Sequence, residues 1–105
     1  MPQFGVYRNE NTASRERCPF LVDVQADLLD ELGTCVVIPL SKAAELTGFP
    51  TQYLTPVIPF RGQSYALLTP QLAGISREEL GPLVGSLAEQ QRVISAAIDF
   101  MIRGF

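Results

Sequence analysis

Thr34-Cys35-Val36-Val37-Ile38 is the stretch that decides the fold, because it is apolar on both faces of an extended chain. A strand that buries both of its faces lies inside a fold and not at its surface. The sequence therefore predicts a central strand at residues 34–38. Pro39 follows this strand and is predicted to end it, because proline has no N–H to donate to the ladder.

Four further extended segments are predicted around this strand, at residues 3–7, 20–24, 53–60 and 64–69. Phe4 and Val6 lie on one face of the first segment. Phe20, Val22 and Val24 alternate in the same way and are predicted to point inward. About five antiparallel strands of this kind form a small, strongly bent sheet or barrel.

Turn-forming and chain-breaking residues indicate how these strands are connected. Two prolines interrupt residues 53–60, which places that segment at a sheet edge or a bulge. Arg61-Gly62-Gln63 is predicted to form the hairpin turn into the following strand. Ser41 is predicted to cap a short helix over residues 42–46.

Two helix starts show the spacing of a capping box, a serine followed three residues later by a glutamate. Ser76 and Glu79 are predicted to open a short helix, which Gly81-Pro82 stops. Ser86 and Glu89 are predicted to open the final helix. One apolar face of that helix holds Leu87, Ile94, Ala97, Ile98 and Met101. The strands followed by one main helix predict a mainly β fold of the α+β class.

A second apolar face near the end of the chain indicates a protein-binding surface. Phe100, Ile102 and the terminal Phe105 lie away from the first apolar face of the final helix. A helix that is apolar on two sides favours a two-fold symmetric homodimer, with the two chain ends close together. We expect Ile98 and Met101 to lie at the dimer interface.

The chain of 105 residues is predicted to form a single domain over residues 1–105. Its apolar fraction of 47% fits a compact soluble protein. It shows neither a signal peptide nor a run of about 18 apolar residues, so a cytoplasmic protein without a membrane segment is expected. A net charge of −3 and scattered basic residues argue against direct DNA binding.

The residue types needed for most catalytic and metal sites are missing. The sequence has no histidine and no glycine-rich phosphate loop, so no catalytic residue, metal or cofactor is predicted. Cys18 and Cys35 are isolated and are predicted to be free thiols. A carboxylate-based hydrolase would have only the acidic run between Asp23 and Glu31 to draw on. The chain is therefore predicted not to be an enzyme.

Residues 8–17 are polar and rich in turn formers, which predicts a solvated, mobile loop. Arg8, Arg15 and Arg17 give this loop three positive charges. Such a loop either remains a solvated connection or steers an acidic peptide toward the protein.

Several of these runs together resemble one protein family nearly from end to end. They are Gln3-Phe4 with Val6-Tyr7, Phe20-Leu21-Val22-Asp23-Val24-Gln25-Ala26-Asp27-Leu28-Leu29-Asp30, Val37-Ile38-Pro39-Leu40, Pro56-Val57-Ile58, and residues 97–105. The chain resembles the CcdB family, the toxins of CcdA–CcdB toxin–antitoxin pairs. The resemblance implies a homodimer with an SH3-like antiparallel barrel, a small side sheet and a long C-terminal helix.

The resemblance also implies a mode of action. CcdB proteins bind the GyrA component of DNA gyrase and trap the gyrase–DNA cleavage complex. The toxin is therefore expected to contact DNA only indirectly, through gyrase or the antitoxin. A disordered segment of the CcdA antitoxin neutralises them. Carried over by position, the gyrase-binding set is Leu28, Leu29, Asp99, Ile102, Arg103, Gly104 and Phe105. The antitoxin surface is not carried over by position, and the positive charge of Arg8, Arg15 and Arg17 makes them the predicted antitoxin-binding residues.

Two positions depart from the family pattern. The best-known member has Trp at the position of Arg103 and Asn at that of Asp99. Arg103 can stack on a guanidinium, pair with an acid or remain a solvated helix-terminal cation. A homologue that binds the antitoxin and takes part in operon autoregulation without poisoning gyrase is therefore an alternative. A generic SH3-like interaction module, in which Phe105 seals the core, is another.

Overall fold

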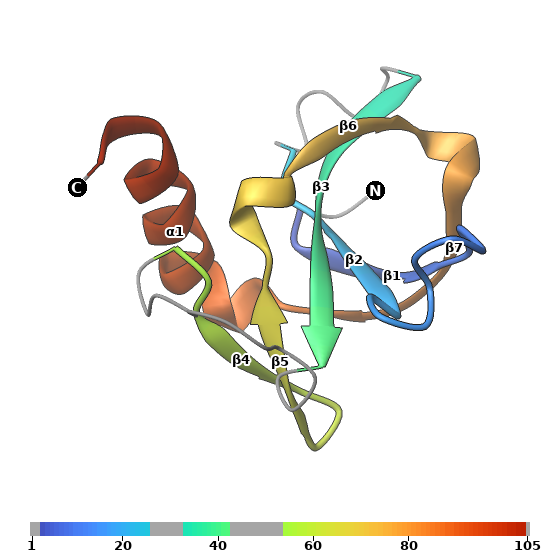
Figure 1. Cartoon of the computed structure of the whole chain (residues 1–105), viewed down its shortest axis with the longest axis horizontal. Helices are drawn as coiled ribbons and strands as arrows, with labels where there is room; N and C mark the ends of the chain where they lie inside the picture. The colour runs from blue at the N-terminus through green and yellow to red at the C-terminus, as the bar shows by residue number, and fades with distance from the viewer. Residues whose placement is uncertain (1–2, 26–32, 43–53, 105) are drawn as a thin grey trace.

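The computed structural model describes residues 3–25, 33–42 and 54–104 as a small ring of strands beside a hairpin and one helix (Figure 1). The strands are β1 (Gly5–Asn9), β2 (Phe20–Asp23), β3 (Thr34–Lys42), β4 (Val57–Phe60), β5 (Gln63–Leu67), β6 (Ala73–Ser76) and β7 (Leu80–Ser86). The helix is α1 (Gln91–Arg103), and 3₁₀ turns lie at η3 (Thr69–Gln71), η4 (Arg77–Glu79) and η5 (Ala88–Gln90). The predicted mainly β, α+β architecture is confirmed.

Strand β3 is the centre of the sheet, as predicted. Its middle pairs antiparallel with β2, while its other edge pairs first with β6 and then with β5. From β6 the chain turns through η4 into β7, and β7 pairs with β1 beside β2. Strands β1, β2, β3, β6 and β7 therefore enclose the ring seen in Figure 1. The β4–β5 hairpin extends from the end of β3 and forms the side part of the same sheet.

The prediction that Pro39 ends the central strand is wrong, and so is the helix cap at Ser41. Strand β3 continues through both residues to Lys42. The carbonyl of Pro39 accepts a hydrogen bond from the Leu68 N–H at 3.0 Å. The N–H and C=O of a strand residue point to the same side. The N–H that Pro39 lacks would therefore point to the place where β3 changes its partner from β6 to β5, between the two ladders. The remainder of the predicted helix at residues 42–46 lies outside the described residues.

Two hydrophobic clusters lie on opposite faces of β3. Val6, Val22 and Ile38 face one another across three strands and lie in the main cluster. Helix α1 covers that face with Ile94 and Ala97, which are fully buried. Because successive strand side chains alternate, the opposite face holds the second cluster. That cluster contains Leu21, Cys35 and Val37, with Ile75 and Leu80 packed against them.

The prediction of about five strands missed β6 and β7. Strand β7 contains two glycines and a proline, and its Gly81-Pro82 pair is predicted from sequence to stop a short helix. A Cβ at Gly81 would lie 2.6 Å from the Arg8 carbonyl oxygen, so the close approach of β1 requires glycine there. Pairing between β1 and β7 is irregular beyond Val6, and such a bulged pairing tolerates Pro82.

The final helix starts later than its capping-box spacing predicts. The Ser86 hydroxyl accepts a hydrogen bond from the Ala88 N–H, and the chain then forms η5 before α1 begins at Gln91. The capping box of Ser76 and Glu79 is confirmed, although it opens only the 3₁₀ turn η4. In the three described ranges, no helix has both the length and the apolar character needed to cross a membrane.

The hairpin turn is confirmed. Phe60 pairs with Gln63, which leaves Arg61 and Gly62 as a two-residue loop. Both loop residues have positive φ, 51° for Arg61 and 78° for Gly62, as a type I′ turn requires. The Arg61 guanidinium donates to the Val84 carbonyl, which connects the hairpin to β7.

Candidate interaction surfaces

The C-terminal end of α1 presents an exposed patch. Asp99, Ile102 and Arg103 are all exposed, and their spacing of three and four residues places them on one side of the helix. The Ile102 side chain is 71% exposed, the most exposed large apolar side chain in the described part of the chain. An apolar side chain surrounded by charged ones is typical of a protein-binding surface.

Gly104 ends the helix in a defined way. Its φ of 81° lies in the left-handed region, and its N–H donates to the Phe100 carbonyl at 2.8 Å. Glycine at this position lets the backbone leave the helix axis without a steric penalty. The structure therefore brings together four of the seven predicted gyrase-binding residues. Leu28, Leu29 and Phe105 lie outside the described residues.

The predicted dimer-interface residues lie on the inner side of the helix. Ile98 is half-buried and packs against the main hydrophobic cluster of its own protomer. Met101 is also half-buried, one turn nearer the end of the chain. Both side chains keep part of their surface exposed to solvent, which leaves the homodimer a prediction.

Most residues of the loop at 8–17 are exposed, as predicted, and hydrogen bonds within the loop support its backbone. The Asn9 side chain donates to the Cys18 carbonyl at 2.8 Å and to the Ser14 hydroxyl at 3.0 Å. The Asn11 carbonyl accepts from the backbone N–H groups of Ser14 and Arg15. Side chains that hydrogen-bond the local backbone in this way stabilise turns.

The three loop arginines are divided between two clefts. Arg8 and Arg15 line a cleft of about 540 Å³ together with Asn9, Glu10 and Pro19. Arg17 lies in the wall of a second cleft, on the other side of the loop. Arg8 and Arg15 therefore share one cleft and Arg17 lines the neighbouring one, with Asn9 and Glu10 common to both.

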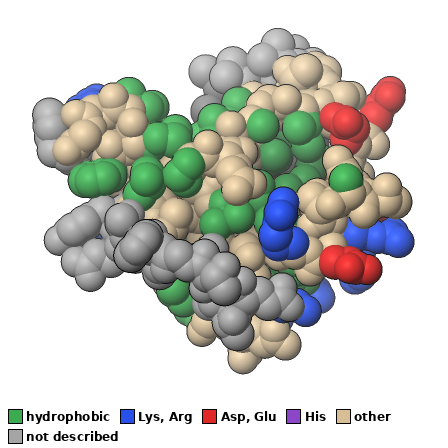
Figure 2. Space-filling model, viewed as in Figure 1, with side chains coloured by type: hydrophobic (Ala, Val, Ile, Leu, Met, Phe, Trp, Pro, Cys, Tyr) green, Lys and Arg blue, Asp and Glu red, His purple; other side chains and the backbone are tan. Residues whose placement is uncertain are grey.

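The second cleft opens over the ring of strands, where the surface is hollowed and hydrophobic side chains lie at the bottom of the hollow (Figure 2). It has a volume of about 550 Å³. The side chains that line it are those of Asn9, Glu10, Asn11, Thr12, Ser14, Arg17, Cys18, Leu21, Val37, Pro39, Gln71, Ala73, Ile75, Glu78 and Glu79. The sequence does not predict this cleft, because β6 and η4 form one side of it and β6 was not predicted. The capping box at Ser76 was the one available signal.

Both cysteines are free thiols, as predicted, and both are buried. Burial raises the pKa of the Cys35 thiol above its ordinary value of 9.0. The nearby Asp23 charge raises the pKa further, and the Arg77 charge opposes this effect. Cys35 is therefore a protonated member of the second hydrophobic cluster and not a reactive thiolate.

The family model of CcdB, described as the CcdB protein, matches residues 3–104. The chain belongs to the CcdB family. Membership of the CcdB family supports a toxin of a toxin–antitoxin module, with an antitoxin as partner, and it supports a protein that is not a classical enzyme.

A solved structure also resembles the fold of this CcdB-family chain. The Mycobacterium tuberculosis toxin MazF-mt6 superimposes with a TM-score of 0.65 at 13% sequence identity. The match covers 93% of this chain and 95% of the other. At this level of identity the match shows a shared fold.

Proposed function

We propose that this chain is a toxin that binds the GyrA component of DNA gyrase through the end of α1 and traps the gyrase–DNA cleavage complex. The observation that carries the proposal is the exposure of Ile102 beside Asp99 and Arg103 on a helix end. An apolar anchor inside a charged rim resembles the binding hot spots of other interfaces. Membership of the CcdB family supports a toxin of a toxin–antitoxin module, and we propose gyrase in the cytoplasm as its target.

The remaining members of the proposed gyrase surface are Gly104, Leu28, Leu29 and Phe105. Gly104 supports this role because it stops α1 and frees the backbone to approach a partner closely. In a homodimer, two such helix ends would face one GyrA dimer, so the symmetry of toxin and target would match. Ile98 and Met101 are our proposed dimer contacts.

Neutralisation by a CcdA-like antitoxin is proposed to use the arginine loop. Arg8 and Arg15 line one cleft and are both exposed, so an acidic segment of the antitoxin would meet two positive charges there. Arg17 lies across the loop and would contribute through the longer-range field.

The test uses Ile102→Asp, which changes a side chain that is 71% exposed and so leaves the core intact. We expect this variant to lose GyrA binding and to stop accumulating cleaved DNA in a gyrase supercoiling reaction. Loss of a central apolar anchor weakens an interface by about 2–4 kcal/mol. The matched control is Val57→Asp, which places the same charge on β4 at a side chain that is 54% exposed.

The proposal would be overturned if Ile102→Asp trapped cleaved DNA as well as the unchanged protein does. Equal losses in the Ile102→Asp and Val57→Asp variants would also contradict it, because a general effect of the added charge would then explain the result. Circular dichroism of both variants shows whether the fold is retained.

A second function is favoured by one observation at the same helix end. Arg103 is exposed where the best-known family member has Trp, and an arginine lacks the aromatic face that stacks on a guanidinium. The alternative is a homologue that binds its antitoxin and helps to autoregulate its operon but poisons gyrase weakly. Arg103→Trp separates the two functions. A gain in gyrase affinity of tenfold or more from a weak starting value favours the homologue, and little change favours the toxin.

A further inference from the structure

We propose that the cleft over the ring of strands binds an extended peptide of a partner protein, one that carries an aliphatic side chain between a Lys or Arg and an acidic group. The cleft shares Asn9 and Glu10 with the cleft that Arg8 and Arg15 line, but its apolar floor and its η4 wall have no part in the gyrase and antitoxin contacts proposed above. The proposal therefore goes beyond the function proposed above. It rests on the apolar floor of the cleft and on the opposite charges at its two ends.

The floor of the cleft fits an aliphatic side chain. Leu21 and Val37 are buried in the second hydrophobic cluster and line the cleft, and Ile75 packs against them from β6. A cavity of about 550 Å³ lies within the range of roughly 300–1,000 Å³ that is usual for ligand pockets. An apolar group seated there would cover this floor from solvent.

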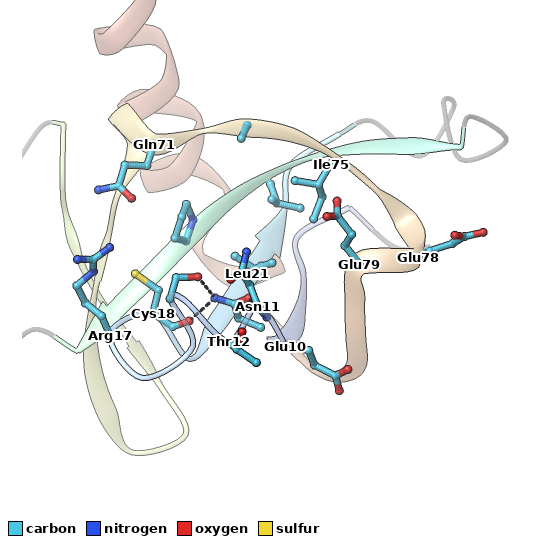
Figure 3. A pocket seen from close by; sticks show the side chains of 15 residues that line it. Glu10, Asn11, Thr12, Arg17, Cys18, Leu21, Gln71, Ile75, Glu78 and Glu79 are labelled. Atoms are coloured by element: carbon cyan, nitrogen blue, oxygen red, sulfur yellow. Dashed lines mark hydrogen bonds between the residues drawn. The ribbon is translucent and has the colours of Figure 1, made fainter.

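One end of the cleft is acidic. Figure 3 shows Glu78 and Glu79 on η4 and Glu10 below them, all at the same end. The Glu79 carboxylate accepts a hydrogen bond from the Ser76 N–H at 3.1 Å, which fixes one wall of this end. Within the residues that the structure describes, no three acidic, Cys or His side chains group closely enough to hold a metal ion. Carboxylates on the loop and on η4 fit the long side chain of a Lys or Arg, which reaches separate carboxylates through several donors.

The opposite end of the cleft is cationic and polar. Arg17 and Gln71 lie there in Figure 3, across the cleft from Glu78 and Glu79. A guanidinium binds a carboxylate through paired hydrogen bonds, so an Asp, a Glu or a chain-terminal carboxylate suits this position. The order of groups along the peptide is then cation, aliphatic side chain, anion, which distinguishes it from a uniformly acidic ligand.

The wall formed by the loop is organised before a ligand binds. The Asn9 side chain donates hydrogen bonds across the loop to the Ser14 hydroxyl and the Cys18 carbonyl. The Asn11 side chain accepts a hydrogen bond from the Ala13 N–H at 2.9 Å. A wall that is already ordered spares the peptide part of the entropic cost of binding. The cleft can therefore bind a short segment weakly without refolding.

The experiment titrates the ¹⁵N-labelled protein with the peptide acetyl-Gly-Lys-Leu-Asp-Gly-amide and follows amide chemical shifts. We expect shifts at Leu21, Ile75 and Glu79 and none at Ile102. A Lys-Ala-Asp peptide, which lacks the aliphatic side chain, should bind at least about tenfold more weakly. A Glu-Leu-Glu peptide, which lacks the cation, should show a similar loss.

The double variant Glu10→Gln, Glu78→Gln changes two exposed side chains at the acidic end and should weaken the first peptide about threefold or more. The matched control is Glu89→Gln, an exposed glutamate on η5 that does not line the cleft. The proposal is overturned if the cleft amides do not shift, if the Lys-Ala-Asp peptide binds equally well, or if spermidine alone gives the same shifts. Gyrase poisoning by the double variant is read separately, so this proposal and the proposed function can fail independently.

Discussion

Cys35 shows how one buried side chain links the fold to pH. Its thiol lies in the second hydrophobic cluster, and burial and the Asp23 charge both favour its protonated form. The pKa in the folded protein is therefore higher than in the unfolded chain. The contribution of Cys35 to stability is complete below about pH 9 and is lost as the pH rises through the folded pKa.

We predict that Cys35→Ala removes this part of the alkaline loss of stability. Urea unfolding between pH 7 and pH 10.5 measures the unfolding free energies of the unchanged protein and of Cys35→Ala. We expect the difference between the two free energies to narrow above pH 9, because only the unchanged protein releases the Cys35 proton on unfolding. Cys18→Ala, which removes the other buried thiol, is the control variant. Parallel curves for the unchanged protein and Cys35→Ala would contradict this prediction.

At the scale of single residues, the sequence predicted burial better than it predicted local backbone conformation. Val22 and Ile38 were expected inside and are fully buried, because alternation in a strand determines which side chains share a face. Pro39 and Ser41 were misread because local propensity gives way to partners that are distant in sequence. Nothing in the sequence near Pro39 indicates that β3 changes partner at that point.

At the scale of elements, the β4–β5 hairpin and β7 are held together by a close contact. A Cβ at Gly85 would lie 2.7 Å from Cε1 of the Phe60 ring, and this ring is buried. Phe60 also makes edge-on contacts with Phe20 and Tyr65, with ring centres 5.3 and 6.3 Å away. The ring therefore has little room to move away from β7.

We predict that Gly85→Ala destabilises the protein by about 1–3 kcal/mol, because the new methyl group overpacks this contact. Gly74→Ala is the matched control, since a Cβ at Gly74 meets nothing within 4 Å. Both free energies are measured by urea denaturation. Adding Phe60→Leu should recover part of the loss in Gly85→Ala. Equal unfolding free energies of the two alanine variants would contradict this prediction, because they would show that the Phe60 ring moves to accommodate the new methyl group.

Elements with a strong local pattern were predicted, and those defined by a distant partner were not. The hairpin turn, the capping box at Ser76 and the central strand all follow from short-range chemistry. Strand β7 has two glycines and a proline, which carry no strand pattern. Its shape is determined by the close approach of β1 at Gly81 and of Phe60 at Gly85.

At the scale of the whole molecule, we predict a homodimer whose contact includes the exposed parts of Ile98 and Met101 near the end of α1. Met101→Asp should shift the protein toward monomers, because it places a charge in the proposed apolar contact. Val93→Asp, at an exposed position of the same helix, is the control. Sedimentation equilibrium at micromolar concentration measures both. A monomer in the unchanged protein, or equal dissociation of the two variants, would contradict the proposal.

The candidate surfaces were predicted to different extents from the sequence. The end of α1 was predictable because the helix pattern and the family resemblance point to the same few residues. The three loop arginines were predicted as one antitoxin-binding set, and the sequence does not show that Arg17 lines a different cleft from Arg8 and Arg15. The cleft over the ring needs loop, sheet and η4 together, which no local pattern encodes.

Strand β3 has a consequence for how the molecule comes apart. It supplies one wall to each hydrophobic cluster and pairs with three other strands. Neither half can lose its order while the other keeps it, so native-state hydrogen exchange in β3 should require global opening. A fragment that retains the helix without the ring would lack a surface to fold against. Any change that disrupts the pairing of β3 would then inactivate the toxin, even if that change lies far from a binding surface.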